Sequence, residues 1–224
     1  MAQTPVVFLA CRVFEGHINT QAANVVQYLD YGLHRVPKQL RERLQAELEQ
    51  LPEPSLVVLG YGLCGNGLDG LQAGPHTLVV PKVDDCVAIF LGSRDRYYEE
   101  FNNHPGTYYL TKGWLEAGSD PLGEYEALVE KYGCDTADWL MDQQYRHYRR
   151  LVFVAHSNTE LETYRPRATQ VATYCQRWGM HYQERMGGAA YFAQISAQLN
   201  RQAGPSEQFL VISPGETLTQ ALFR

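Results

Sequence analysis

The sequence predicts a single α/β domain over residues 1–224, with a Rossmann-like, mostly parallel sheet and helices on both faces. Continuous apolar runs of four to six residues have the pattern of strands that are buried on both faces. Segments with apolar residues at helical spacing lie between these runs, and this alternation is typical of a parallel sheet. A chain of 224 residues with 45% hydrophobic residues is also long enough to bury a core of this kind.

The clearest helix is expected near residues 37–50. Pro37 suits the first turn of a helix, and Leu40, Leu44 and Leu48 recur at helical spacing among charged residues. The other expected elements are strands at 5–10, 56–60, 77–81, 151–155 and 209–212, and helices at 159–178 and 189–201.

One long segment between the third and fourth expected strands departs from this alternation. Residues 94–150 contain many aromatic side chains, and a helical pattern runs from about 121 to 150. We interpret this segment as a helical insertion that could serve as a lid. The alternative is that its side chains only add to the core and the surface.

Charge and hydropathy argue against two classes of partner. The chain has 19 basic and 25 acidic residues and no evident basic face, so we expect no nucleic-acid partner. The longest apolar runs, such as 151–155, are too short to span a bilayer, so we expect no membrane partner. The opening residues have no apolar export signal, and we therefore expect a cytoplasmic protein.

Three of the five cysteines share a position in the predicted fold. Cys11, Cys64 and Cys86 each follow one of the first three expected strands. Because parallel strands end at the same edge of a sheet, we expect these three thiols to converge there. Cys134 and Cys175 lie in helical patterns and are expected to be core residues. The odd number and the absence of a C-x-x-C pair argue against a disulfide framework and a zinc ribbon.

Three thiolates at one place select a soft metal. We favour a [4Fe–4S] cluster held by Cys11, Cys64 and Cys86, because three ligands leave one iron open to a substrate. The substrate would be a small polar or sulfur-containing molecule. Lewis-acid chemistry such as dehydration or desulfuration, carried out by an iron–sulfur lyase or desulfidase, would suit an open iron.

Three alternatives stay open at this point. A zinc ion could replace the cluster, with His17, His34 or Asp85 as its fourth ligand. The thiolates could instead be nucleophiles whose pKa values are lowered by helix N-termini. The chain could also be a non-catalytic accessory protein that binds a metal or a corrinoid during methyl transfer.

The segment from Gly60 to Gly65 has the G-x-G-x-x-G spacing of a dinucleotide fingerprint. That fingerprint needs a helix directly after it, and Gly67, Gly70 and Gly74 disfavour one. We therefore interpret the glycines as positions where backbone N–H groups can approach a cluster or an anion closely.

Other polar and aromatic side chains near the expected strand ends could act on a substrate. The candidates for proton transfer and catalysis are His34, Lys82 and Asp85. The candidates for substrate binding supply an anion-binding guanidinium, an aromatic wall for a planar ligand and a carboxylate after the last strand. These are Arg94, Tyr108, Tyr109, Trp114 and Glu216.

Five motifs are long enough to be specific for a family. They are Gly32–His34, Gly60–Gly67, Asp85-Cys86 with Leu91–Arg94, Pro105–Trp114 and Pro214–Thr217. Together they resemble family number 1638 of the domains of unknown function, and the resemblance covers nearly the whole chain. The family is often found beside genes for corrinoid-dependent methyltransferases, which implies a methyltransferase or a corrinoid protein as a partner by association.

Overall fold

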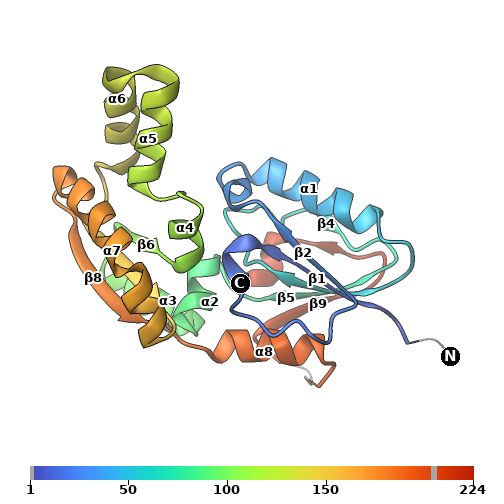
Figure 1. Cartoon of the computed structure of the whole chain (residues 1–224). Coiled ribbons are helices and arrows are strands. Elements are labelled where there is room, and N and C mark those ends of the chain that lie inside the picture. The colour runs from blue at the N-terminus through green and yellow to red at the C-terminus, as the bar shows by residue number, and fades with distance from the viewer. Residues whose placement is uncertain (1–2, 203–205) are drawn as a thin grey trace. The chain divides into compact units, whose positions relative to one another are not determined.

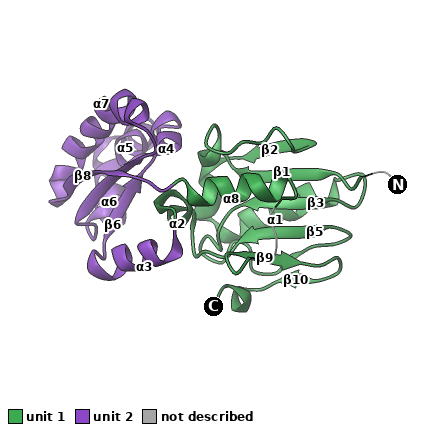
Figure 2. Ribbon diagram, turned by 90° about the horizontal axis from the view of Figure 1, so that it is seen from below, with its two compact units in different colours: residues 1–92, 189–224 green, residues 93–188 purple. Residues whose placement is uncertain are grey.

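A computed structural model describes residues 3–202 and 206–224, which form two compact units (Figure 2). Unit 1 comprises Met1–Gly92 and Ala189–Arg224, and unit 2 comprises Ser93–Gly188. Both units combine helices with a mostly or entirely parallel sheet, so the expected mixed α/β class is confirmed.

Unit 1 contains a five-stranded sheet whose first four strands are parallel and whose last strand is antiparallel. All six positions of β1 are buried, as expected for a strand covered on both faces. Figure 1 shows α1 (Pro37–Glu49) and α8 (Ala190–Leu199) on opposite sides of this sheet. The strand order is β2 (Val25–Leu29), β1 (Val6–Cys11), β3 (Leu56–Gly60), β5 (Thr77–Pro81) and β9 (Phe209–Ile212).

The helix expected near residues 37–50 is α1, which begins at Pro37 because a missing N–H costs nothing in the first turn. Leu40, Leu44 and Leu48 of α1 are buried, which confirms the apolar face that their spacing predicts. The short elements of unit 1 are the 3₁₀ turns Arg12–Phe14, Tyr31–Arg35 and Gln220–Phe223, the pair β4 (Leu71–Gln72) and β10 (Thr217–Leu218), and helix α2 (Cys86–Leu91).

Unit 2 has its own three-stranded parallel sheet in the order β6 (Thr107–Leu110), β7 (Arg150–Ala155) and β8 (His181–Met186). Its central strand β7 is buried at all six positions, and α7 packs against it. The helices of unit 2 are α3 (Arg94–Asn103), α4 (Lys112–Glu116), α5 (Pro121–Tyr132), α6 (Cys134–Tyr145) and α7 (Asn158–Cys175), followed by the 3₁₀ turn Gln176–Trp178.

This unit differs from the helical insertion that we expected at 94–150. It continues to Gly188, and the strand expected at 151–155 pairs with β6 and β8 instead of joining the sheet of unit 1. The reason is that only the central strand of the second sheet is a continuous apolar run. The edge strand β8 is polar and has no buried residue, so its sequence gives no strand pattern.

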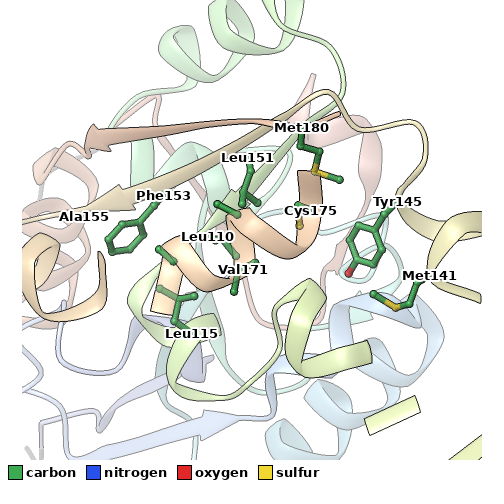
Figure 3. Close-up of a cluster of buried hydrophobic side chains, with 12 residues drawn as sticks. Leu110, Leu115, Met141, Tyr145, Leu151, Phe153, Ala155, Val171, Cys175 and Met180 are labelled. Carbon is green, nitrogen blue, oxygen red and sulfur yellow. The ribbon is translucent and has the colours of Figure 1, made fainter. Parts of the chain in front are cut away.

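The core of unit 2 lies between its sheet and helices α4, α6 and α7 (Figure 3). Leu151 and Phe153 project from β7, while Val171 and Cys175 come from α7. This unit therefore has a hydrophobic core of its own, as a separately packed unit requires. None of the helices in the described part of the chain has the length and apolar character that crossing a membrane requires.

Candidate functional site

Three cysteines leave the sheet of unit 1 at one edge. Strands β1, β3 and β5 are parallel neighbours, with Ala10 opposite Gly60 and Val58 opposite Val79. Cys11 is the last residue of β1, Cys64 follows the end of β3, and Cys86 opens α2 just after β5. The carboxyl edge of a parallel sheet is the usual place for a ligand site, and all three thiols start from it.

Two hydrogen bonds join the loops that carry Cys64 and Cys86. The N–H of Leu63 donates to the carbonyl oxygen of Val83 at 2.9 Å, and the N–H of Cys64 donates to that of Asp84 at 2.8 Å. Gly62 makes this approach possible, because a Cβ at its position would lie 2.9 Å from atoms of Val83 and Asp85. The two cysteines are thus held by backbone contacts as well as by their strands.

The three thiols influence one another electrostatically. Burial raises the pKa of Cys11 to about 11. Burial also raises the pKa of Cys64, with further contributions from the charges of Asp85 and Cys11. The pKa of Cys86 is raised well above its ordinary value by burial, then by Cys64, Asp85 and Cys11. These shifts oppose the alternative that the cysteines are activated nucleophiles, because a nucleophilic thiol needs a lowered pKa.

The spacing of the sulfur atoms bears on the kind of metal that they could hold. The Sγ atoms of Cys11, Cys64 and Cys86 do not all lie within 4.8 Å of one another. Thiolates that share one tetrahedral zinc at bond lengths of about 2.3 Å stand only about 3.8 Å apart. The three sulfurs therefore do not form the compact ligand set that one zinc ion needs.

Tyr61 is a residue of the site that our sequence analysis did not select. It directly follows β3, and its side chain is only 2% exposed. Its hydroxyl is buried and has no hydrogen-bond partner among the described residues. Burial raises the pKa of Tyr61 well above its ordinary value, and the charges of Cys11, Cys64 and Cys86 raise it further. The phenol therefore lies within electrostatic range of all three thiols.

The loop that carries Cys64 has an unusual backbone. Cys64, Gly65 and Asn66 have successive φ angles of 48°, 64° and 70°, in the left-handed region. Such a conformation is unfavourable for a cysteine, and strain of this kind is concentrated at functional sites.

No helix follows Gly65, which agrees with our interpretation that the glycine motif is not a dinucleotide fingerprint.

Of the three expected catalytic groups, Asp85 lies near the thiols. Asp85 caps α2 by accepting a 2.8 Å hydrogen bond from the N–H of Val87, and its charge acts on Cys64 and Cys86. His34 is exposed, and its Nδ1 lies 2.7 Å from the carbonyl oxygen of Tyr31. Desolvation lowers the pKa of His34, while its hydrogen bond to Tyr31 and the charge of Asp85 oppose this shift.

Lys82 contributes to the sheet through its backbone. Its N–H donates to the carbonyl oxygen of Gln208 at 2.8 Å, which places the residue beside the segment that leads into β9. Within residues 3–202 and 206–224, its ammonium makes no hydrogen bond or ion pair. Lys82 is therefore not assigned to the site.

Four expected substrate-side residues belong to unit 2 and have partners there. Arg94 donates to the hydroxyl of Tyr98 at 3.1 Å within α3, and Trp114 is part of α4. Tyr108 packs edge-on against Tyr145 in the core of unit 2. Tyr109 points to the other face of β6, because successive strand residues alternate, so the two tyrosines do not form one wall.

Glu216 lies at the opposite edge of the sheet, which corrects its expected position. Strand β9 is antiparallel to β5, with Ile212 opposite Leu78, so β9 ends near the start of β5. The carboxylate of Glu216 accepts a 2.7 Å hydrogen bond from the N–H of Ser213 and closes the turn after β9. Our expectation assumed a last strand that ends at the same edge as the thiols.

The remaining cysteines and His17 have other environments. Cys175 is fully buried in the core of unit 2, as expected, whereas Cys134 is exposed at the start of α6, so its expected burial was wrong. The ring of His17 stacks on Phe192 and meets Phe90 edge-on. His17 and His34 do not form a compact ligand group with the three thiols, which weakens the zinc alternative.

Comparison with known proteins identifies one match. The model of a family described as "Protein of unknown function (DUF1638)" matches residues 28–195 of the 224 residues. This range includes Tyr61, Cys64 and Cys86, and Cys11 precedes it. No curated protein and no solved structure matches the chain.

Proposed function

Since the chain belongs to the DUF1638 family, whose function is unknown, we propose from its own geometry that Cys11, Cys64 and Cys86 bind a [4Fe–4S] cluster. Each thiolate binds one iron, and the fourth iron stays open to a small molecule. The observation that carries this proposal is that all three cysteines stand at the carboxyl ends of three neighbouring parallel strands.

Charge supports a metal centre at this place. Burial raises the pKa of all three thiols, and the charges of neighbouring thiols raise the pKa of Cys64 and Cys86 further, so three thiolates at this place are unfavourable without a counter-charge. A cationic centre removes this repulsion and replaces the three protons. We propose a cluster and not a single ion, because the sulfurs do not all lie within 4.8 Å of one another and one tetrahedral ion would need them closer.

The open iron acts as a Lewis acid in this proposal. The reaction is an elimination of water or hydrogen sulfide from a small substrate. A base would remove a proton from carbon as a carbon–carbon double bond forms and the bond to the leaving hydroxide or hydrosulfide breaks, and the cluster would supply the Lewis acid for that anion. Asp85 is the proposed base, because its carboxylate acts on two of the thiols, and His34 passes the proton to water.

The test is the metal content of protein purified without oxygen. The wild-type protein is expected to contain iron and acid-labile sulfide in equal amounts. Cys11→Ala, Cys64→Ala and Cys86→Ala are each expected to lose most of both, because each removes one of three ligands. Cys134→Ala and Cys175→Ala serve as controls that keep the wild-type content. Equal iron in all five variants would contradict the proposal.

A second candidate is a non-catalytic metal- or corrinoid-binding accessory protein in methyl transfer. The observation that favours it is that Arg94, expected to hold an anionic substrate, binds Tyr98 in its own helix. Iron-loaded protein that binds a corrinoid protein or a methyltransferase, and eliminates neither water nor hydrogen sulfide from any substrate, would support this role. Both candidates assume a reducing cytoplasm, where thiol ligands are not lost to disulfides.

A further inference from the structure

The hydroxyl of Tyr61 is a buried polar group without a partner. Its residue is 2% exposed, and its Oη finds no hydrogen-bond acceptor among the described residues. Buried hydroxyl groups in native proteins almost always have a partner, so each exception calls for an explanation such as a bound ligand or ion. We therefore look for the hydrogen-bond partner of the Tyr61 hydroxyl in a ligand that binds beside it.

Close packing on both sides fixes the backbone that carries Tyr61. Tyr61 stands between Gly60 and Gly62, and a Cβ on either glycine would collide with neighbouring atoms, of Ala10 and of Val83 respectively. The backbone on both sides is thus packed closely against the adjacent strand and loop. The three thiols of Cys11, Cys64 and Cys86 all lie near enough to act on the phenol.

Tyr61 differs in chemistry from the other side chains that act on these thiols. Asp30 acts on Cys11, and Asp85 acts on Cys64 and Cys86, and both are carboxylates. An ionised carboxylate only accepts hydrogen bonds, whereas a phenol can donate one. A donor directed at a negatively charged ligand makes a stronger hydrogen bond than one directed at a neutral ligand.

We propose that the Tyr61 hydroxyl donates a hydrogen bond to the molecule bound at the open iron. This inference rests on the proposed function and defines its substrate class. The atom that binds the iron is an anionic oxygen or sulfur, such as an alkoxide, hydroxide, thiolate or hydrosulfide, which keeps a lone pair for the phenol. A protonated amine has no lone pair, so it cannot accept a hydrogen bond from the Tyr61 hydroxyl.

The test compares Tyr61→Phe with wild-type protein, both as the full chain loaded with iron and sulfide under anaerobic conditions. Hydrosulfide is the probe, and its binding is followed by the electron paramagnetic resonance spectrum of the reduced cluster. Tyr61→Phe is expected to keep the wild-type iron and sulfide content and to bind hydrosulfide roughly tenfold more weakly or worse. Tyr145→Phe, which removes a buried hydroxyl in unit 2, is expected to match the wild type.

The outcomes separate this inference from the proposed function. If the wild-type protein takes up no cluster, the proposed function fails and this inference fails with it. If Tyr61→Phe loads its cluster and binds hydrosulfide as tightly as the wild type, only the donor role is overturned. Loss of iron in Tyr61→Phe would overturn the donor role too, because the hydroxyl would then be needed to hold the cluster.

Thermal unfolding of the metal-free variants controls for folding. Tyr61→Phe is expected to be at least as stable as wild type, since it removes an unpartnered hydroxyl.

Discussion

The N–H of Cys64 donates a 2.8 Å hydrogen bond to the carbonyl oxygen of Asp84, two residues before Cys86. This bond connects the loop after β3 with the loop after β5. It means that the separation of two proposed iron ligands depends on backbone contacts and not on side-chain rotamers alone. Preorganisation of this kind is what a metal site requires of the residues around its ligands.

Gly62→Ala tests whether this contact between the two loops is required. A methyl group at residue 62 would meet the backbone of Val83 and Asp85 at 2.9 Å, and backbone atoms cannot move aside cheaply. We expect the variant to lose about 1–3 kcal/mol in the free energy of unfolding, the usual cost of overpacking. It should also retain less iron than the wild type. Urea denaturation of the metal-free protein and an iron assay measure the two effects.

Gly32→Ala is the matched control for this prediction. An added Cβ at Gly32 would have only the Asp30 carboxylate nearby, at an ordinary contact distance of 3.8 Å. This variant should therefore stay within about 0.5 kcal/mol of the wild type in stability. If Gly62→Ala and Gly32→Ala proved equally stable and bound equal iron, the close approach of the loops would not matter for the site.

Burial of Cys11 predicts a loss of stability at alkaline pH in the metal-free protein. Burial raises the folded-state pKa of Cys11 to about 11, although the N–H of Val13 lowers it. An unfolded cysteine has a pKa of about 8.5, so the folded state keeps its proton at a pH where the unfolded state loses it. The stabilisation from this group is complete below about pH 8.5 and disappears as the pH rises towards the folded-state value.

The comparison of wild type with Cys11→Ala isolates this effect. The stability of metal-free wild type should fall more steeply between about pH 8.5 and 11, by up to about 3 kcal/mol more than that of the variant. Urea denaturation at several pH values measures the difference. Parallel curves for the two proteins would show that Cys11 is not a buried, protonated thiol in the metal-free state.

The strands that carry the thiols could be predicted from the sequence, because each is an uninterrupted apolar run. β1, β3 and β5 are such runs, and the parallel order that follows from their alternation with helices brings their ends to one edge. We did not predict β2 from the sequence, because it is an edge strand on which Val25 and Val26 are exposed. The pattern of a buried strand is absent there.

The residues around the thiols were harder to predict. An apolar run such as 209–212 indicates burial but carries no direction, so the antiparallel course of β9 and the position of Glu216 could not be derived. Tyr61 was missed because a tyrosine after a strand is usually a packing residue. The available signal was its place between Gly60 and Gly62, in the same loop as Cys64.

A buried ion-pair network holds the sheet of unit 2 to α3. The carboxylate of Glu100 in α3 accepts hydrogen bonds from Arg150 in β7 and from Arg185 in β8. Glu100 is 9% exposed and Arg150 is 7% exposed. Burial by itself raises the pKa of Glu100, but the hydrogen bonds and charges of the two arginines outweigh it, so the pKa lies below its ordinary value.

Glu100→Gln is expected to lower the free energy of unfolding by about 3 kcal/mol near neutral pH, because it leaves a buried arginine without its counter-charge. The folded-state pKa of Glu100 lies below the unfolded value of about 4.3, so its stabilisation is complete above that pH and is lost as the pH falls through the folded-state pKa. Urea denaturation of both proteins should therefore show a large difference in the free energy of unfolding at neutral pH, and this difference should disappear in acid.

Glu99→Gln, at the exposed neighbouring position of the same helix, is the control and should have the stability of the wild type at every pH. A gap between wild type and Glu100→Gln that stayed constant down to acid pH would mean that the carboxylate stabilises unit 2 by its shape and not by its charge.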